Sequence, residues 1–251
     1  MSNTLSAVVI AKNEQANIIN CLNSLKFCNE IIVIDDFSED KTAQIARRLG
    51  AKVYIRDSNG DFSGQRNFGI LKTNSKWILF VDADEIITKK LGQEIARETK
   101  KTVNYVSGYF FRRIDNIWGS VIKHGEVGDV RLLRLARRDA GKWQRTVHEY
   151  WHIIGETRVL TNPIMHYPHP TIAEFLREIN QRSTMHALAN KKESKRSSIV
   201  KIVFNPIFKF ANGYLFKFGF LDGLAGFVIA MVMSLHSFLS WSKLWVMEKN
   251  K

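Results

Sequence analysis

The chain has 251 residues, of which 45% are hydrophobic and 24% are charged. This composition is typical of a globular protein with a buried core and excludes an intrinsically disordered chain. Cys21 and Cys28 are too few for a disulfide framework or a four-cysteine zinc site, so we expect a reducing compartment. The first residues show neither a basic run nor a small-residue cleavage pattern, which predicts a cytoplasmic protein without a signal peptide.

The formal net charge of +13 is unevenly distributed along the chain. Residues 191–251 hold ten Lys and Arg against three Asp and Glu. A basic segment attracts polyanions, so nucleic acid, anionic lipid and phosphorylated small molecules all agree with the charge alone. A basic nucleic-acid-binding protein is therefore a rival hypothesis. Because the charge lies beside long apolar runs and the sequence has no nucleic-acid-binding motif, we expect no nucleic acid partner.

Strands and helices alternate in the first ninety residues. Short apolar, β-branched runs predict strands at 5–11, 30–35, 51–56 and 77–81. Helices are predicted between them, with Asn13 and Ser38 as N-caps, Gly50 as a C-cap and a third helix near 65–73. Four strands alternating with three helices predict an α/β fold with a doubly wound, mostly parallel sheet.

The pattern changes after residue 103. Residues 105–114 and 130–138 form longer runs with aromatic side chains, which favour a mixed or antiparallel half of the same domain. Thr171 and Glu174 form a capping box that predicts a helix extending toward the basic run at 191–196. That run is typical of a linker or a solvated face.

An apolar and aromatic segment with interspersed lysines follows at 199–247. Residues 223–242 carry no formal charge and are long enough to cross a bilayer. Three interpretations compete: a membrane-spanning helix, a core helix, and an interfacial segment whose aromatic side chains enter the headgroup region while its lysines contact lipid phosphates. Because His236 and neighbouring Ser and Trp residues dilute the hydrophobicity, we favour the interfacial segment.

Polar side chains follow three of the predicted strands, at the sheet edge where ligands bind in parallel α/β folds. They are Ala11–Glu14, Asp35–Asp36 and Asp82–Asp84. If extended, Asp82 and Asp84 point to one side and can share a divalent cation with its bound phosphates, whereas the alternative is a helix N-cap near Thr88. Asp35–Asp36 is also similar to the acidic pair of receiver domains, but there the pair ends the first strand.

Four motifs, VVIAKNE, VIDDFSED, GQRNFG and ILFVDADE, stand in this order at the strand ends. Together they resemble the A-type nucleotide-sugar glycosyltransferases of the large inverting family 2. The resemblance implies that Asp36 faces the base of the donor, that Arg66 contacts the nucleotide or diphosphate, and that Asp82 contacts the ribose. It also implies a divalent metal, Mg²⁺ or Mn²⁺, on Asp84. The turn that contains Ala11, Asn13 and Glu14 would line the nucleotide.

The run VRLLRLARRDAGKWQRTVHE is similar to the acceptor-side region of bacterial lipopolysaccharide-core members of family 2. This similarity implies that Glu149 is the base that deprotonates the acceptor hydroxyl, with Asp129 as the reserve and His148 as an orienting or packing residue. The alternative for Glu149 is a surface ion pair with a nearby arginine.

His166 and a cluster of arginines complete the candidate residues of the second half. In A-type transferases a late histidine often supplies a further metal ligand, which implies that role for His166 unless it is structural. The arginines either bind phosphate groups of an anionic acceptor or face outward from an edge strand. The cluster consists of Arg112, Arg113, Arg131 and Arg134.

The C-terminal FGFLDGLAGFVIA resembles the tails of lipopolysaccharide-core glucosyltransferases that add β-1,4-glucose to the inner heptose. It implies UDP-glucose as donor, an inner-core heptose as acceptor, and a peripheral position on the anionic inner face of the cytoplasmic membrane. We therefore expect a glycosyltransferase domain over 1–190, divided into a nucleotide-sugar half (1–100) and an acceptor half (101–190), and a helical membrane-associating region over 191–251. A family 2 enzyme for another glycan, lipid or protein acceptor and a catalytically silent scaffold are the remaining alternatives.

Overall fold

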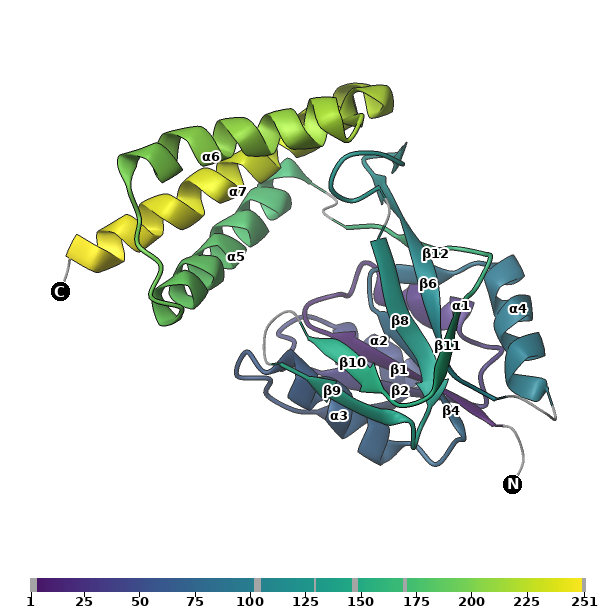
Figure 1. Cartoon of the computed structure of the whole chain (residues 1–251). Helices are drawn as coiled ribbons and strands as arrows, with labels where there is room; N and C mark the ends of the chain where they lie inside the picture. Colours follow the sequence, from purple (N-terminus) through teal and green to yellow (C-terminus); the bar gives the residue numbers. More distant parts are fainter. Residues whose placement is uncertain (1–3, 102–104, 129, 146–148, 169–170, 250–251) are drawn as a thin grey trace. The chain divides into compact units, whose positions relative to one another are not determined.

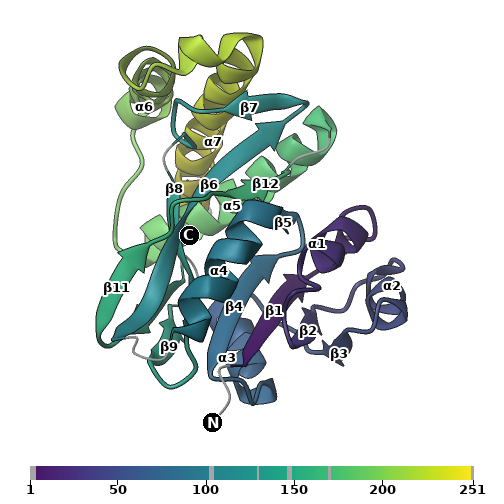
Figure 2. The same ribbon diagram turned by 90° about the vertical axis from the view of Figure 1, so that its right-hand side faces the viewer.

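A computed structural model describes residues 4–101, 105–128, 130–145, 149–168 and 171–249 (Figures 1 and 2). Contacts divide the chain into two compact units. The α/β unit comprises Met1–Arg113 and Val130–His166, and the helical unit comprises Ile114–Asp129 and Tyr167–Lys251. Helix α5 (Ile172–Lys192) and residues 114–129 both group with the helical unit. The division into a catalytic domain over 1–190 and a membrane-associating region over 191–251 stays a prediction.

Four parallel strands form the first half of the sheet in the order β3-β2-β1-β4. Their bounds are Leu5–Ala11 for β1, Glu30–Asp35 for β2, Lys52–Ile55 for β3 and Trp77–Asp82 for β4. The apolar, β-branched runs form these strands because both faces of a parallel sheet are buried. The prediction of an α/β fold with a parallel first half is confirmed.

The sheet continues beyond β4 with mixed pairing. Strand β8 (Val130–Arg137) is antiparallel to both β4 and β6 (Val106–Ile117). Next along the sheet lie β12 (Ile164–His166) and β5 (Glu85–Ile87), while β11 (Glu156–Val159) pairs in parallel with β6. Strands β9 (Gly141–Gln144) and β10 (Tyr150–Ile153) form a separate antiparallel pair. The predicted mixed second half is therefore confirmed as well.

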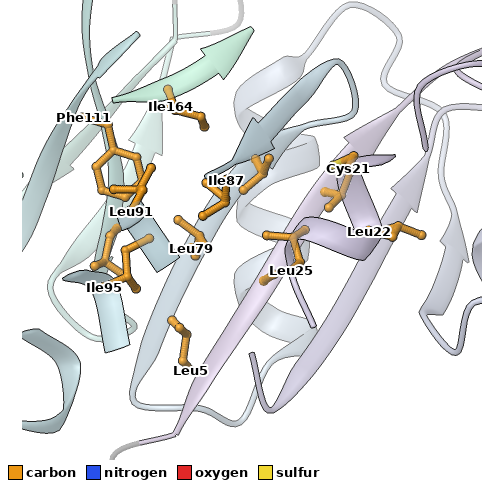
Figure 3. Packing of buried hydrophobic residues seen from close by; sticks show 14 of the residues in the cluster. Leu5, Cys21, Leu22, Leu25, Leu79, Ile87, Leu91, Ile95, Phe111 and Ile164 are labelled. Atoms are coloured by element: carbon orange, nitrogen blue, oxygen red, sulfur yellow. The ribbon is translucent and has the colours of Figure 1, made fainter. Parts of the chain in front are cut away.

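Helices cover both faces of the parallel strands. Alternate residues of β1 enter two different clusters, with Ala7 and Val9 on one side of the sheet and Val8 on the other. The first cluster includes Leu22 of helix α1 and Leu91 of helix α4, and Figure 3 shows these side chains converging on the sheet. The α/β-unit helices are α1 (Ile18–Ser24), α2 (Thr42–Arg48), α3 (Phe62–Lys72) and α4 (Lys89–Lys100).

Helix starts differ from the prediction at three places. The N-cap position of α1 is Asn17, while Asn13 lies in the preceding turn with φ 56° and its Oδ1 accepts a hydrogen bond from the Glu39 N–H. Ser38 does not cap α2; its hydroxyl instead accepts a hydrogen bond from the Asn13 backbone N–H (2.9 Å). Helix α3 begins at Phe62, because the carboxylate of Asp61 accepts from the Gly64 N–H and stabilises an earlier start than predicted.

Three aromatic rings join the β9–β10 pair to the second face of the sheet. Phe80 of β4 lies edge-on to Trp143 and Trp151, at centroid distances of 5.2 and 5.0 Å, and the two indoles stack at 5.4 Å. Each such pair adds about 0.5–1.5 kcal/mol beyond the area it buries. The cluster therefore fixes the chain on both sides of the segment that leads to Glu149.

The helical unit is built around α7 (Gly223–Lys249), which contacts both α5 and α6 (Ile199–Ala211) along its length (Figure 1). A π-helical turn (Asn212–Phe216) and a 3₁₀ turn (Gly219–Asp222) connect α6 to α7. Strand β7 (Ser120–Ile122) forms a hairpin with the end of β6 in the same unit. By length and composition, the helical stretch Gly219–Lys249 is the one in the described chain that is able to cross a membrane, with a mean hydropathy of 1.7.

Candidate active site

The predicted polar strand ends meet at one edge of the parallel sheet. In the strand register, Ala11 lies opposite Asp35, and Ile10 of the same strand lies opposite Asp82. The carboxyl ends of three adjacent strands therefore bring the three motifs side by side, as the βα alternation predicts.

Asp82 is 31% exposed and is the centre of a network of charges whose other members, Arg66, Arg134 and Glu85, are buried. Its Oδ1 accepts a hydrogen bond from Arg66 Nη2 (2.9 Å), and its Oδ2 accepts from Arg134 Nη2. Arg134 Nη2 also donates to Glu85 Oε1 (2.7 Å), and Glu85 Oε2 accepts the Asp82 backbone N–H (2.9 Å). Burial disfavours the charged form of Asp82, but Arg134 and Arg66 outweigh it and hold the pKa of Asp82 well below its usual range. Asp82 is thus an anion in the folded protein.

Arg66 joins Asp82 to the predicted base. Its Nε lies 3.3 Å from Glu149 Oε1, and its guanidinium carbon lies 4.6 Å from the Trp143 ring centroid. The Arg66 side chain is only 9% exposed, and its Nη1 has no hydrogen-bond partner in the described part of the chain. A buried guanidinium with an unpaired N–H can donate a hydrogen bond to a further acceptor. Its planar array of N–H groups matches the oxygens of a phosphate.

Asp84 and His166 form a second pair at the same strand end. Strands β5 and β12 are antiparallel with His166 opposite Glu85, which places the imidazole beside the preceding carboxylate. His166 Nε2 lies 3.1 Å from Asp84 Oδ2. Asp84 Oδ1 is buried and has no hydrogen-bond partner in the described chain. The structure brings these two predicted metal ligands together.

The Asp84–His166 pair fits a divalent cation that takes its remaining ligands from elsewhere. No group of three His, Cys, Asp or Glu side chains within the described residues is arranged to hold a metal ion. Mg²⁺ is often held by one or two carboxylates together with substrate phosphates, and Mn²⁺ also accepts imidazole. The unpartnered Asp84 oxygen agrees with such an incomplete, substrate-completed site.

Asp36 is held rigidly at the end of β2. Its carboxylate accepts hydrogen bonds from the backbone N–H and the hydroxyl of Ser58, both at 2.8 Å, and pairs with Lys12 Nζ at 3.2 Å. Burial raises the pKa of Asp36, but these hydrogen bonds and Lys12 outweigh it and lower the pKa overall. A fixed carboxylate at this position is suited to accept hydrogen bonds from a nucleobase.

The turn after β1 contributes backbone hydrogen-bonding groups and the carboxyl group of Glu14, whose pKa is raised. Ala11 accepts the Asp36 N–H through its carbonyl (2.9 Å), and Asn13 Oδ1 accepts the Glu39 N–H (2.8 Å). Glu14 accepts a hydrogen bond from Asn17 Nδ2 (2.8 Å). Burial, together with the nearby negative charges of Asp84, Asp40 and Asp82, raises the pKa of Glu14 to about 7, although the Asn17 bond opposes the shift.

Sequence reasoning missed the structural role of Arg134 and Glu85. It assigned Arg134 to acceptor phosphate or to an outward-facing edge, and both assignments are wrong because the guanidinium is 5% exposed and is committed to Asp82 and Glu85. A charged residue within the buried run LLRLA was the available signal, since a buried charge needs a buried partner. Of the other predicted arginines, Arg112 and Arg131 lie opposite each other on β6 and β8 and are exposed. Asp129 and His148 lie outside the described residues.

Carboxylates at the ends of parallel strands, two arginines from α3 and β8, and an imidazole from β12 meet at the sheet edge where parallel α/β folds bind ligands. Residues 6–182 match the model of glycosyl transferase family 2, and the chain belongs to this family. The resemblance inferred from the four motifs is thereby confirmed, and the protein is a glycosyltransferase.

Relatives are similar over nearly the whole chain. The lipopolysaccharide core biosynthesis glycosyltransferase LpsC of Rhizobium meliloti is 28% identical over 248 residues, covering 96% of this chain and 92% of LpsC. An uncharacterized glycosyltransferase of Rickettsia felis is 29% identical over 258 residues, covering 96% of this chain and 89% of the relative. Among solved structures, S. aureus TarS 1-349 aligns over 99% of this chain and 92% of its own, with 13% identity and a TM-score of 0.48.

Proposed function

We propose that this glycosyltransferase moves glucose from UDP-glucose, with inversion, onto a heptose of the lipopolysaccharide inner core. The observation that carries the proposal is the position of Arg66, which joins Asp82 at the end of β4 to the carboxylate of Glu149. One residue thus connects a nucleotide-binding strand end to a potential base. The similarity to LpsC, whose name assigns it to lipopolysaccharide core biosynthesis, supports the acceptor class.

On the donor side, Asp36 would accept hydrogen bonds from the uracil and Asp82 from the ribose hydroxyls. Arg66 would contact the diphosphate through its unpaired Nη1 and would then share its charge between the phosphate and Asp82. Arg134 would hold Asp82 in place throughout, because its side chain is only 5% exposed and pairs with both Asp82 and Glu85. The Ala11–Glu14 turn would line the nucleotide.

Asp84 and His166 are the residues that would hold the divalent cation. When bound, the cation neutralises charge that develops on the departing nucleoside diphosphate. The Asp84 carboxylate is anchored for this role, since its Oδ2 contacts the imidazole and its Oδ1 remains unpartnered in the described chain. Mg²⁺ and Mn²⁺ both agree with this pair of ligands.

Glu149 would act as the base in a single displacement. The acceptor hydroxyl oxygen forms a bond to the anomeric carbon of glucose, the bond from that carbon to the UDP oxygen breaks, and the hydroxyl proton passes to Glu149. In the structure Arg66 pairs with Glu149, and contact of Arg66 with the donor diphosphate would weaken that pair. Donor binding would therefore free the base for the acceptor.

A lipopolysaccharide acceptor is anchored by its lipid chains, so the enzyme would work on the anionic inner face of the cytoplasmic membrane. The lysine-rich, apolar C-terminal region supports this peripheral location.

Thermal unfolding across a panel of nucleotide sugars, each with Mg²⁺, Mn²⁺ or chelator, tests the donor. A ligand that binds only the native state raises the melting temperature by mass action. We expect a metal-dependent rise with UDP-glucose, followed by glucose transfer to heptose-terminated core oligosaccharide. Equal shifts with every donor would contradict the choice of UDP-glucose. Transfer to other glycans but not to the heptose acceptor would contradict the proposed acceptor.

A further inference from the structure

Helix α6 and the turns that follow it expose an unusual number of large apolar side chains. We call this set the apolar surface. Its members are Ile199, Val200, Val203, Phe204, Ile207, Phe208, Leu215, Phe216, Phe218, Phe220 and Leu221. A soluble monomer rarely exposes a contiguous apolar patch of this kind without a partner.

The six α6 members of the apolar surface share one face of the helix. They occur as neighbouring pairs that repeat every four residues, and this spacing keeps them on the same side of an α-helix. The opposite side contacts the rest of the helical unit, where Pro206 is buried and its carbonyl accepts a hydrogen bond from Ser234 Oγ (2.8 Å). Helix α6 is therefore amphipathic, with its apolar face turned away from the unit.

Exposed formal charges in this segment are all positive. Between Ser198 and Leu224, every residue of which is described, the charged residues are Lys201, Lys209, Lys217 and Asp222. The Asp222 side chain is 4% exposed and accepts hydrogen bonds from the backbone N–H groups of Lys123 and His124, while its Oδ1 lies 2.8 Å from His124 Nδ1. The acid is turned inward and the Lys217 side chain is exposed, whereas Lys209 Nζ pairs with Glu126 Oε1 (2.7 Å) and Lys201 Nζ lies 4.8 Å from the Trp241 ring centroid. Lys217 and the excess positive charge of this segment complement an anionic surface.

The turn between α6 and α7 is held in a fixed shape. An added Cβ at Gly226 would collide with the Gly219 carbonyl oxygen, and one at Gly219 would lie 2.6 Å from the Gly213 carbonyl oxygen. Within this turn Phe218 adopts a left-handed conformation (φ 57°) and is 57% exposed. A bulky residue in a strained conformation that points its ring outward indicates a binding role for the turn.

Helix α7 is poorly placed to cross a membrane. It packs along α5, where Lys243 Nζ donates to the Asn180 carbonyl (2.5 Å) and to Ser183 Oγ (2.8 Å). Helix α5 carries charged side chains along its length, including Arg177, Arg182 and Lys191. A spanning α7 would either carry these charges into the hydrocarbon or lose its contacts with α5.

We propose that the apolar surface docks the protein on an anionic phospholipid bilayer, with α6 lying in the plane of the headgroups and α7 remaining inside the protein. The aromatic and aliphatic side chains enter the boundary between headgroups and acyl chains, and Lys217 contacts lipid phosphates. The inference rests on the proposed membrane location and assigns it to α6 and its turn, instead of to the uncharged stretch 223–242.

Vesicle co-sedimentation of the full chain tests the docking surface. Phosphatidylcholine vesicles are used with and without phosphatidylglycerol. The double variant Phe204→Ser/Phe208→Ser should lower binding to anionic vesicles at least about tenfold, because each phenyl ring contributes to burial in the bilayer. Lys217→Glu should lower it about fivefold or more, since each surface cation favours anionic lipid.

Matched controls are available in the α/β unit. Leu71→Ser/Ile154→Ser removes two equally exposed apolar side chains, and Lys90→Glu reverses an exposed lysine. Both controls should bind vesicles like the wild type. Unchanged binding of the Phe204/Phe208 variant, or equal losses in the controls, would overturn the proposal. So would a wild-type protein that fails to pellet with anionic vesicles.

Two further outcomes contradict the proposal in recognisable ways. Protein that stays with cell membranes through high salt and alkaline carbonate would indicate a spanning α7. A stable dimer of the wild type that the Phe204/Phe208 variant abolishes would indicate a second copy of the chain on this surface. Failure of the glycosyl-transfer proposal is separable, because vesicle binding requires neither donor nor acceptor.

Discussion

At the scale of single residues, Asp84 offers an unpartnered carboxylate oxygen beside the His166 imidazole. Asp84→Asn keeps the size of the side chain and removes its charge. We expect at least about a hundredfold loss of metal-dependent turnover, because the cation stabilises charge on the leaving group. We also expect loss of the metal-dependent thermal shift. The exposed Asp139→Asn is the matched control, and unchanged turnover in Asp84→Asn would remove this residue from the metal site.

Glu149→Gln tests the base separately from donor binding. Removing a general base lowers turnover about 10²- to 10⁴-fold, while the amide still fills the space beside Arg66. We therefore expect a large fall in kcat with the UDP-glucose-induced thermal shift retained. A variant with normal kcat would transfer the role of base to another carboxylate.

Glu14 gives the folding stability a specific dependence on pH. Its folded pKa of about 7 exceeds the ordinary glutamate pKa of 4.5, so between these values the native state keeps a proton that the unfolded state loses. The stability of the wild type relative to Glu14→Gln should therefore fall as pH rises from about 5 to 7, by about 2 kcal/mol or about 5 °C in Tm, and then level off.

Thermal unfolding in chelator at several pH values measures this difference. The exposed Glu39→Gln is the control and should show no such trend relative to wild type. A constant difference between wild type and Glu14→Gln across this pH range would show that Glu14 titrates normally.

Several residues of the site were predictable because their roles depend on local chain order. Asp36, Asp82 and Asp84 directly follow or end apolar strands, and parallel strands bring their carboxyl ends to one edge. Glu85 was not predictable in the same way. Its partner Arg134 lies 49 residues away, and their contact arises only because β8 pairs antiparallel with β4.

At the scale of elements, β8 carries Arg134 into the buried space beside β4 and β5. Arg134→Met should cost about 3–5 kcal/mol of unfolding free energy, because it leaves the fully buried carboxyl group of Glu85 without its cation and removes one of the two arginines on Asp82. Urea unfolding measures the loss. Adding Glu85→Gln to Arg134→Met should recover part of it, and a double variant as unstable as the single one would show that charge is not the cause.

The bounds of helices and strands could be predicted from the sequence where a single capping residue or a single apolar run sets them. The strands at 5–11 and 30–35 were predicted at their observed bounds, because continuous β-branched runs end at polar residues. The start of α3 was predicted late, since the Asp61 cap gives only a weak local signal. The packing of α7 between α5 and α6 could not be predicted from the uncharged stretch 223–242, because hydropathy does not show which helices are neighbours.

At the scale of the whole molecule, the proposed catalytic and docking functions fall in different units and should be separable. The candidate active site lies within the α/β unit, and the apolar surface lies within the helical unit. Phe204→Ser/Phe208→Ser should leave transfer to a soluble, deacylated core acceptor unchanged. It should lower transfer to the acylated form of this acceptor, embedded in vesicles, about tenfold at limiting lipid, in proportion to lost binding.

Glu149→Gln serves as the reciprocal control, because loss of the base should lower transfer to both acceptors by the same factor. Comparing the ratio of the two rates among wild type, Glu149→Gln and the Phe204/Phe208 variant cancels differences in enzyme concentration and stability. A ratio that stays constant in the Phe204/Phe208 variant would mean that the acceptor recruits the enzyme without the apolar surface. A changed ratio in Glu149→Gln would mean that this residue also contributes to acceptor access at the membrane.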